Sequence, residues 1–192
     1  MSLIYLYAAH MIGYWGSVAV CTRLYPRNVT VFALWCALEV IKNQVLFTPL
    51  IAAPLFYIWP ESLDFRQNAI WQFPVMFVMS DVIFYHFHRL FHLPGMFQYH
   101  KKHHVWSRPL GMLALYADAA EHCIVNTLPP LLAAMLVKAD FWCLLIWISL
   151  ISAHTVISHS SEGEHYLHHR DRKVNFGTGF NEVYACQGVD IN

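Results

Sequence analysis

Residues 141–155 read FWCLLIWISLISAHT, an apolar run that contains no charged side chain. A helix needs about 20 residues to cross the hydrocarbon core of a bilayer, and this run nearly reaches that length. A short turn, Lys138–Asp140, and a second apolar arm, Leu128–Val137, precede it, so the sequence predicts a helical hairpin. The first arm contains two adjacent prolines. We therefore predict that it is a broken half-helix that begins near Leu113.

Three further apolar runs are long enough to span a bilayer. They are Leu3–Cys21, Val29–Trp59 and Ala69 to about Phe87. Val29–Trp59 is longer than one span requires and is interrupted by charged residues and prolines, so we expect a kinked or tilted helix. The fold class that follows is all-α: a multi-pass membrane helical bundle of about four transmembrane helices.

The composition agrees with a membrane protein. Of the 192 residues, 57% are hydrophobic and 12% are charged, against about 25% charged residues in a soluble domain. The formal net charge is zero, which gives no electrostatic reason to expect a nucleic-acid partner. No linker divides the chain, so we predict one domain over residues 1–192. The five cysteines form no CxxC pair and are predicted to pack in the core.

The basic residues predict the orientation in the membrane, because cytoplasmic segments near membrane helices are enriched in lysine and arginine. Threading the spans alternately puts only Arg66 and Lys138 on one side. The other side holds Arg23, Arg27, Arg89, Lys101, Lys102, Arg108, Arg170, Arg172 and Lys173. We predict that this basic side is cytoplasmic, and the histidine-rich segments lie on it as a metal-binding cap.

Most of the thirteen histidines fall into three clusters. The first is His88-Arg-Leu-Phe-His92, whose i, i+4 spacing places both rings on one helix face. The second and third are His100-Lys-Lys-His103-His104 and His165-Tyr-Leu-His168-His169, and both read H-x-x-H-H. About 0.06 such matches are expected by chance in this composition, whereas two occur. On a helix, each triplet is expected to direct three ring nitrogens toward one point.

Ligand counting predicts two metal ions, since eight imidazoles exceed what one ion binds. Imidazole suits zinc, copper, iron and nickel, so ligand type alone does not name the metal. Neutral ligands also call for nearby carboxylates that orient the rings. Asp81 is the leading candidate, because it lies seven residues before His88 on the same face and inside a predicted span. The weaker candidates, each of which could equally be a solvated carboxylate, are Glu121, Glu162, Glu164 and Asp171.

With these residues in view, the sequence resembles the fatty acid hydroxylase and sterol desaturase superfamily of membrane di-iron enzymes over roughly residues 75–180. Members show an acidic residue, then H-R-x-x-H, then H-K-x-H-H, and later a third box, H-x-x-H-H, followed by a short N-[FY]-G-like stretch. Asp81, the three histidine clusters and Asn175–Gly177 match this order. The family's tyrosine-to-glutamate segment after the second box resembles Tyr116–Glu121.

The resemblance also implies one more histidine ligand. The family's D-x-H-S-G or D-H-S-G motif would fall on His159 and Ser160, although its acid and its glycine are missing here. His154 is the alternative, and we favour His159. The isolated His10 and His122 are expected to pack or to form hydrogen bonds. The family's tryptophan-aspartate segment is replaced by residues 180–188, to which we assign no function.

What the resemblance implies is oxygen chemistry on a lipid such as a sterol, fatty acid or sphingoid base. Two irons activate O2 and abstract hydrogen from an unactivated C–H bond, which gives hydroxylation or, by removal of a second hydrogen, desaturation. Electrons come from a b-type cytochrome or another carrier. Lys101, Lys102 and Arg108 could dock it, or could simply reflect the positive-inside bias. The expected location is the endoplasmic reticulum membrane in a eukaryote or the inner membrane in a bacterium.

Two other classes of function are compatible with clustered histidines. A membrane zinc hydrolase would use the same ligands, but HExxH is absent and neither H-x-x-H-H carries a glutamate placed as a general base. The third possible class is a non-catalytic metal-binding membrane protein. It is suggested by the missing acid before His159 and by the unusual end of the sequence. Iron without zinc, together with an oxygen-dependent lipid product, distinguishes the oxygenase from both.

Overall fold

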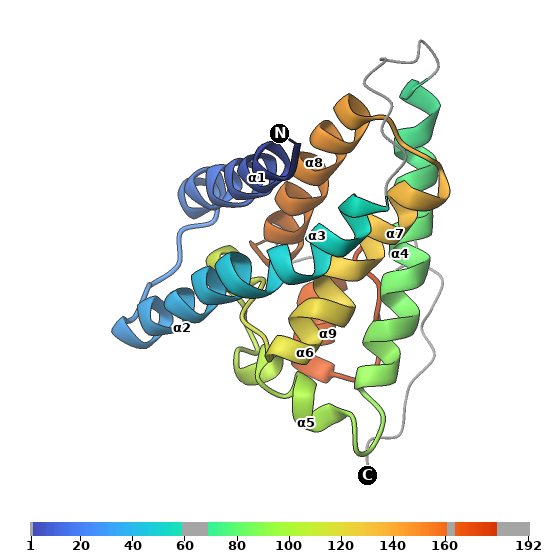
Figure 1. Ribbon diagram of the computed structural model, residues 1–192. Coiled ribbons are helices and arrows are strands. Elements are labelled where there is room, and N and C mark those ends of the chain that lie inside the picture. Colours follow the sequence, from blue (N-terminus) through green and yellow to red (C-terminus); the bar gives the residue numbers. More distant parts are fainter. Residues whose placement is uncertain (1, 59–68, 161–163, 180–192) are drawn as a thin grey trace.

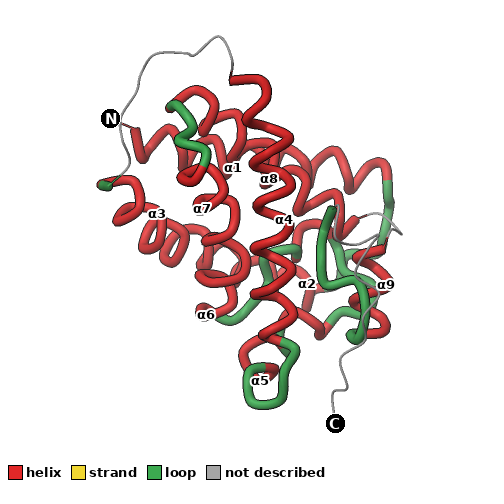
Figure 2. The backbone as a smooth tube through the Cα atoms, turned by 90° about the vertical axis from the view of Figure 1, so that its right-hand side faces the viewer, coloured by secondary structure: helices red, strands yellow, loops and turns green. Residues whose placement is uncertain are grey.

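The structure, a computed structural model, describes residues 2–58, 69–160 and 164–179. Within these ranges every regular element is a helix, and Figure 2 shows no strand among them. The main elements in chain order are α1 (Ser2–Leu24), α2 (Val31–Lys42), η1 (Asn43–Phe47), α3 (Thr48–Tyr57), α4 (Gln72–Phe91), α5 (Phe97–His100), η3 (His103–Val105), η4 (Gly111–Leu113), α6 (Ala119–Glu121), η5 (His122–Thr127), α7 (Leu128–Leu136), α8 (Phe141–Ser160) and α9 (Glu164–Asp171).

Three helices among the described residues are long and apolar enough to cross a membrane: Leu3–Leu24, Val31–Tyr57 and Phe141–Ser160. This confirms the predicted all-α membrane fold class. The fourth predicted span corresponds to α4, which has 20 residues but is not among the three. Its polar side chains, among them Asp81 and His88, lower its hydropathy. The number of spans and their orientation stay predictions.

The second span is continuous but changes its winding at a π-helical segment, η1. A second π-helical segment, η5, precedes α7. Each segment ends two residues before a proline: Pro49 follows η1, and Pro129 follows η5. A proline ring clashes with the carbonyl of residue i−4 and removes one hydrogen bond, so the turn before it widens. The interruption predicted for Val29–Trp59 is therefore a π segment within one helix.

The helical hairpin lies where the sequence predicts it, because α7 ends at Leu136 and α8 begins at Phe141. Its first arm starts later than predicted, at Ala119, where the side chain of Asp118 caps the helix by accepting from Ala120 N at 3.0 Å. Most of the residues from Leu113 to that cap form a loop instead. The amide of Asn43 holds this loop through the carbonyls of Leu115 and Ala117.

Helices α1 and α8 pack closely against each other, as Figure 1 shows. Gly13 makes this approach possible, since a Cβ at this position would collide with the backbone of Ser149. A buried apolar cluster that includes Leu6, Met76 and Trp147 joins α1, α4 and the hairpin. A second one, around Tyr14 and Val40, joins α1 and α2 to the loop after η3.

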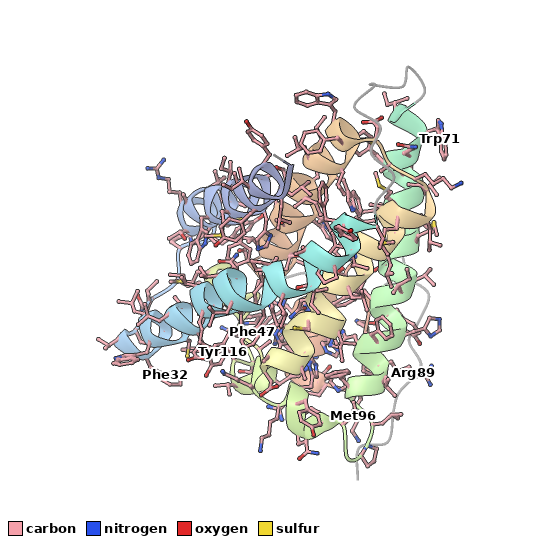
Figure 3. The ribbon with its side chains drawn as sticks, in the orientation of Figure 1. Phe32, Phe47, Trp71, Arg89, Met96 and Tyr116 are labelled. Carbon is pink, nitrogen blue, oxygen red and sulfur yellow. The ribbon has the colours of Figure 1, made fainter. Side chains whose placement is uncertain are left out.

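The outer face of α2 carries large apolar side chains that nothing in the described structure covers. Trp35 is 68% exposed and Val31 is 74% exposed, whereas Phe32, near the N-terminal end of this helix in Figure 3, stacks on Trp106 at 5.6 Å. An exposed apolar face of this kind suits lipid contact. Cys21, Cys36 and Cys143 are buried and Cys123 is partly buried, as predicted for packing residues. Cys186 lies outside the described residues.

Candidate metal centre

Four structural elements carry the predicted histidine ligands to one end of the bundle. They are the C-terminal end of α4, the α5–η3 segment, the C-terminal end of α8, and α9. Figure 1 shows α5, α6 and α9 gathered around the lower end of α4, and Figure 3 places Arg89 at that end and Trp71 at the opposite end. Segments far apart in the sequence thus meet at one site.

All nine predicted ligands come together in two adjacent groups. The five-histidine group consists of His88, His92, His100, His104 and His168. The four-histidine group consists of His103, His159, His165 and His169. Within each group the ring nitrogens lie within 4.8 Å of one another, and every member is buried. The groups adjoin, since the ring centroids of His104 and His169 are 4.8 Å apart.

The expectation that each H-x-x-H-H triplet converges on one point is wrong, because both triplets are divided between the groups. His100 and His104 belong to the five-histidine group, whereas His103 belongs to the other. In the third cluster, His168 belongs to the five-histidine group, whereas His165 and His169 belong to the four-histidine group. On α9 each residue turns by about 100°, so His165 and His169 stay about 40° apart while His168 and His169 differ by about 100°. The second triplet runs from α5 into the 3-10 segment η3, where adjacent residues differ by about 120°. Adjacent histidines therefore serve different groups.

Backbone carbonyls fix which ring nitrogen of several histidines carries the proton. His88 donates its Nδ1–H to the carbonyl of Phe176 at 2.7 Å, and His168 donates to Val174 at 2.7 Å. His165 donates to Gly177 at 3.3 Å, and His159 donates to Thr155, one turn earlier, at 2.8 Å. Because a carbonyl only accepts, each Nε2 is left with a lone pair that can bind a metal.

The spacing of the Nε2 atoms tests whether metal ions fit. His88 Nε2 lies 3.0 Å from His100 Nε2, and His165 Nε2 lies 3.1 Å from His159 Nε2. Two lone pairs cannot share a hydrogen bond, so such pairs need a cation between them. Nitrogens that share an ion with bonds of about 2.1 Å are about 3.0–3.4 Å apart. The Nε2 atoms of His168 and His169 are also buried without a hydrogen-bond partner. The residues fit a metal ion in each group.

Burial keeps these rings neutral. Desolvation lowers the pKa of His168 to about 4, and lowers the pKa of His100, His165 and His169 well below the ordinary value, with neighbouring histidines adding to the effect. A neutral imidazole is the form that binds a metal.

Of the predicted carboxylates, Glu121 reaches the histidines directly. Its Oε1 lies 2.9 Å from Nδ1 of His100 and 3.8 Å from Nδ1 of His103, and all three side chains are buried. Glu121 therefore contacts one member of each group. Asp81 is buried too, and its Oδ1 accepts from the backbone N–H of Thr178 at 3.1 Å.

The weaker acidic candidates are not seen at the rings. Asp171 pairs with Arg170 at the surface, at 2.7 Å. Glu162 lies outside the described residues, and the side chain of Glu164 is likewise not described.

The single histidines have separate roles. His154 is not in either group: its Nε2 donates to the carbonyl of Thr178 at 2.7 Å. His10 lies 2.8 Å from the hydroxyl of Ser152, and His122 lies 2.8 Å from that of Thr48. Both form hydrogen bonds, as predicted.

A cavity of about 680 Å³ opens beside the histidine groups. Its wall at the metal end includes His88, His100, His103 and His159. Apolar residues of α1, α3, α4, α7 and α8 form most of the remainder. On α8 the lining positions extend from Leu144 to His159, which is about 22 Å of helix. The cavity is long, largely apolar and in contact with both groups.

The sequence did not indicate the part played by the main chain of Val174–Thr178, here called the carbonyl segment. Four of its five carbonyls accept hydrogen bonds from histidines. One sequence feature could have indicated this segment: the asparagine of the N-[FY]-G-like match. This residue, Asn175, adopts a left-handed conformation with φ of 57°. Asparagine tolerates this conformation better than most residues.

This geometry defines a helical membrane protein with two buried histidine groups, each able to hold a metal ion, beside an apolar cavity. The sequence model of the fatty acid hydroxylase family matches residues 73–183, and the chain belongs to this family. The resemblance noted from the histidine boxes is thus confirmed.

Curated relatives agree with this assignment. The human fatty acid hydroxylase domain-containing protein 2 is 33% identical over 113 residues, which cover 58% of this chain and 34% of the relative. The C-4 methylsterol oxidase erg25 of Schizosaccharomyces pombe is 28% identical over 150 residues, covering 64% and 48%. The very-long-chain aldehyde decarbonylase GL1-8 of indica rice is 32% identical over 91 residues, covering 47% and 33%. The matches thus span a third to a half of these relatives. No solved structure matches the chain.

Proposed function

We propose that this protein is a membrane lipid oxygenase, an oxidoreductase that hydroxylates or desaturates a lipid such as a sterol, fatty acid or sphingoid base with O2 and external electrons. One observation carries the proposal: histidines of both groups wall one end of a long apolar cavity. A metal-bound oxidant and an apolar chain would meet there. Relatives named as a fatty acid hydroxylase domain-containing protein and as a methylsterol oxidase support the reaction class.

The cofactor in this proposal is a pair of iron ions, one in each histidine group. The two groups support the number two, and iron is what the resemblance to the di-iron superfamily implies. Bound iron would supply the activation of O2 and the removal of hydrogen from an unactivated C–H bond. The nine histidines would hold the ions through neutral ring nitrogens. In seven of these histidines, Nδ1 faces a backbone carbonyl or Glu121.

The cavity residues would select and position the substrate. Leucine, isoleucine and phenylalanine side chains of the membrane helices line it, so an acyl chain or a sterol can enter without leaving an apolar environment. Because α8 lines the cavity for about 22 Å, the bound part of the substrate should be elongated. The lining excludes water from the reacting carbon, which would limit side reactions.

The remaining expectations concern orientation and partners. We propose that the histidine end faces the cytoplasm, in the endoplasmic reticulum of a eukaryote or the inner membrane of a bacterium. Electrons would come from a b-type cytochrome or another carrier. Lys101, Lys102 and Arg108 lie on the segment that carries the second histidine cluster, and a basic edge there would attract an acidic carrier.

Lipid profiling of cells with and without the protein tests the proposal. Expression should produce a mass shift of one oxygen, or a loss of two hydrogens, in one lipid class. The same cells expressing His103→Ala should lack the product, because this change removes one member of the four-histidine group. An unchanged lipid profile in cells that supply iron, oxygen and reductant would contradict the proposed function.

A further inference from the structure

Two polar side chains, the buried Asp81 of α4 and the partly buried His154 of α8, bind the backbone N–H and C=O of the same residue, Thr178. Asp81 of α4 accepts from the N–H of Thr178 at 3.1 Å. His154 of α8 donates to the carbonyl of the same residue at 2.7 Å. The Thr178 backbone is thus attached to two different helices, and each attachment is a side-chain hydrogen bond.

Thr178 is the last residue of the carbonyl segment, and this segment serves both histidine groups. Val174 and Phe176 accept from His168 and His88, which belong to the five-histidine group. Gly177 accepts from His165, which belongs to the four-histidine group. The position of one short backbone stretch therefore sets the orientation of rings in both groups.

The carbonyl segment has no helix or strand of its own to hold it in place. Its other anchor is the ring of Phe176, which is fully buried and packs at 4.9 Å from the ring of His92. At the far end the backbone passes close to α4, since a Cβ on Gly179 would lie 2.6 Å from the ring of Phe77. Phe77 in turn packs edge-on against His154 at 5.2 Å.

We propose that Asp81 and His154 are positioning residues that clamp the backbone of Thr178 and thereby hold the carbonyl segment against both histidine groups. This inference rests on the proposed pair of metals but concerns residues outside the ligand set. It changes the role predicted for Asp81: the carboxylate acts on the rings through the backbone of Thr178. It also gives His154, the alternative ligand, a function that requires no metal contact.

The clamp makes a distinctive prediction about conservative variants. Asp81→Asn keeps an oxygen that accepts from Thr178 N, and His154→Gln keeps an N–H that donates to the Thr178 carbonyl. Asp81→Leu and His154→Leu remove these groups. Loss of a group that contacts a metal ligand directly typically lowers metal affinity 10- to 100-fold. Asp81 and His154 act one step further out, so each leucine variant should bind both metals up to about tenfold more weakly. The amide variants should stay near wild type.

The test measures how much metal the purified full-length protein retains at a series of chelator concentrations. Elemental mass spectrometry gives the metal content of wild type and of the four variants. His86→Leu, on the exposed side of α4, is the matched control and should behave as wild type. X-ray absorption at the metal edge gives a second readout, because nitrogen coordination should fall in the leucine variants and be restored in the amide variants.

Three results would overturn the clamp. Leucine variants that retain both metals would show that the attachment does not matter. An Asp81→Asn variant as weak as Asp81→Leu would show that the charge of Asp81, and not its hydrogen bond, is required. Loss of metal from only one group would show that the segment does not link them. If the leucine variants fail to fold, the amide variants must still keep both metals near wild type, and weaker binding in either of them would overturn the clamp. Wild type without two bound metals would instead overturn the proposed function on which the clamp depends.

Discussion

Glu121 offers the sharpest test of how the protein would support the proposed metal centre. Its Oε1 lies 2.9 Å from Nδ1 of His100 in one group and 3.8 Å from Nδ1 of His103 in the other. A carboxylate in this position fixes the tautomer of His100 and increases its basicity as a ligand. Removing it should therefore weaken metal binding, most strongly in the five-histidine group to which His100 belongs.

The expected size follows from the number of contacts. Loss of one outer partner typically costs 10- to 100-fold in affinity, or about 1.4 to 2.8 kcal/mol. Glu121→Gln keeps an oxygen that can still accept from Nδ1 but loses the charge, so we expect a decrease near tenfold. Glu121→Ala loses the contact itself and should approach a 100-fold decrease.

Chelator competition on the purified protein measures these affinities, with bound metal counted at each chelator concentration. The matched control is Asp140→Asn. Asp140 is an equally buried carboxylate that caps the opposite end of α8 through Cys143 N, at 2.8 Å, so its change should not alter metal binding. If Glu121→Ala holds both metals as tightly as wild type does, the orienting role of Glu121 is refuted.

Three further predictions concern the ligands, the helix packing and the cavity. His103→Ala should lower bound metal from two ions toward one per protein molecule, counted by elemental mass spectrometry, because three ligands remain in its group; two ions retained would contradict the assignment. Gly13→Leu should reduce stability by about 1–3 kcal/mol in thermal unfolding, because its side chain would collide with Ser149. Gly16→Ala, with open space around the Cβ, is the control and should be neutral or slightly stabilising, so equal effects would argue against the close α1–α8 contact. Ile151→Phe narrows the cavity and should reduce turnover of long-chain lipids while both metals stay bound; unchanged turnover would place the substrate elsewhere.

Much of the membrane architecture could be predicted from the sequence because apolar length is a local property. The runs at residues 3–21 and 141–155 correspond to α1 and α8, and the turn at Lys138 separates α7 from α8 as expected. The start of the first hairpin arm was misplaced because tertiary contacts decide it. The hydroxyl of Tyr14 and the amide of Asn43 bind the backbone around Leu115, and this keeps the stretch out of the helix.

The candidate site was predictable in its members but not in its arrangement. Histidine spacing and the resemblance together predicted all nine histidines that the structure brings together. They also favoured His159 as the ninth ligand in preference to His154, and His159 is the one in the groups. Their division into two groups was missed because it depends on the angle between adjacent helical positions and on how α5, α8 and α9 meet. The carbonyl segment was missed because it accepts the histidine hydrogen bonds with backbone carbonyls, which every residue has and which no sequence pattern distinguishes. Asp81 was recognised as important, but its partner lies 97 residues away.

Binding of two irons by the nine clustered histidines is the central claim. Elemental analysis of the full-length protein, purified in mild detergent from cells supplied with both iron and zinc, tests it most directly. We expect two irons per protein molecule and little zinc. Zinc as the bound metal, or fewer than two ions per molecule in a preparation that is folded, would contradict it.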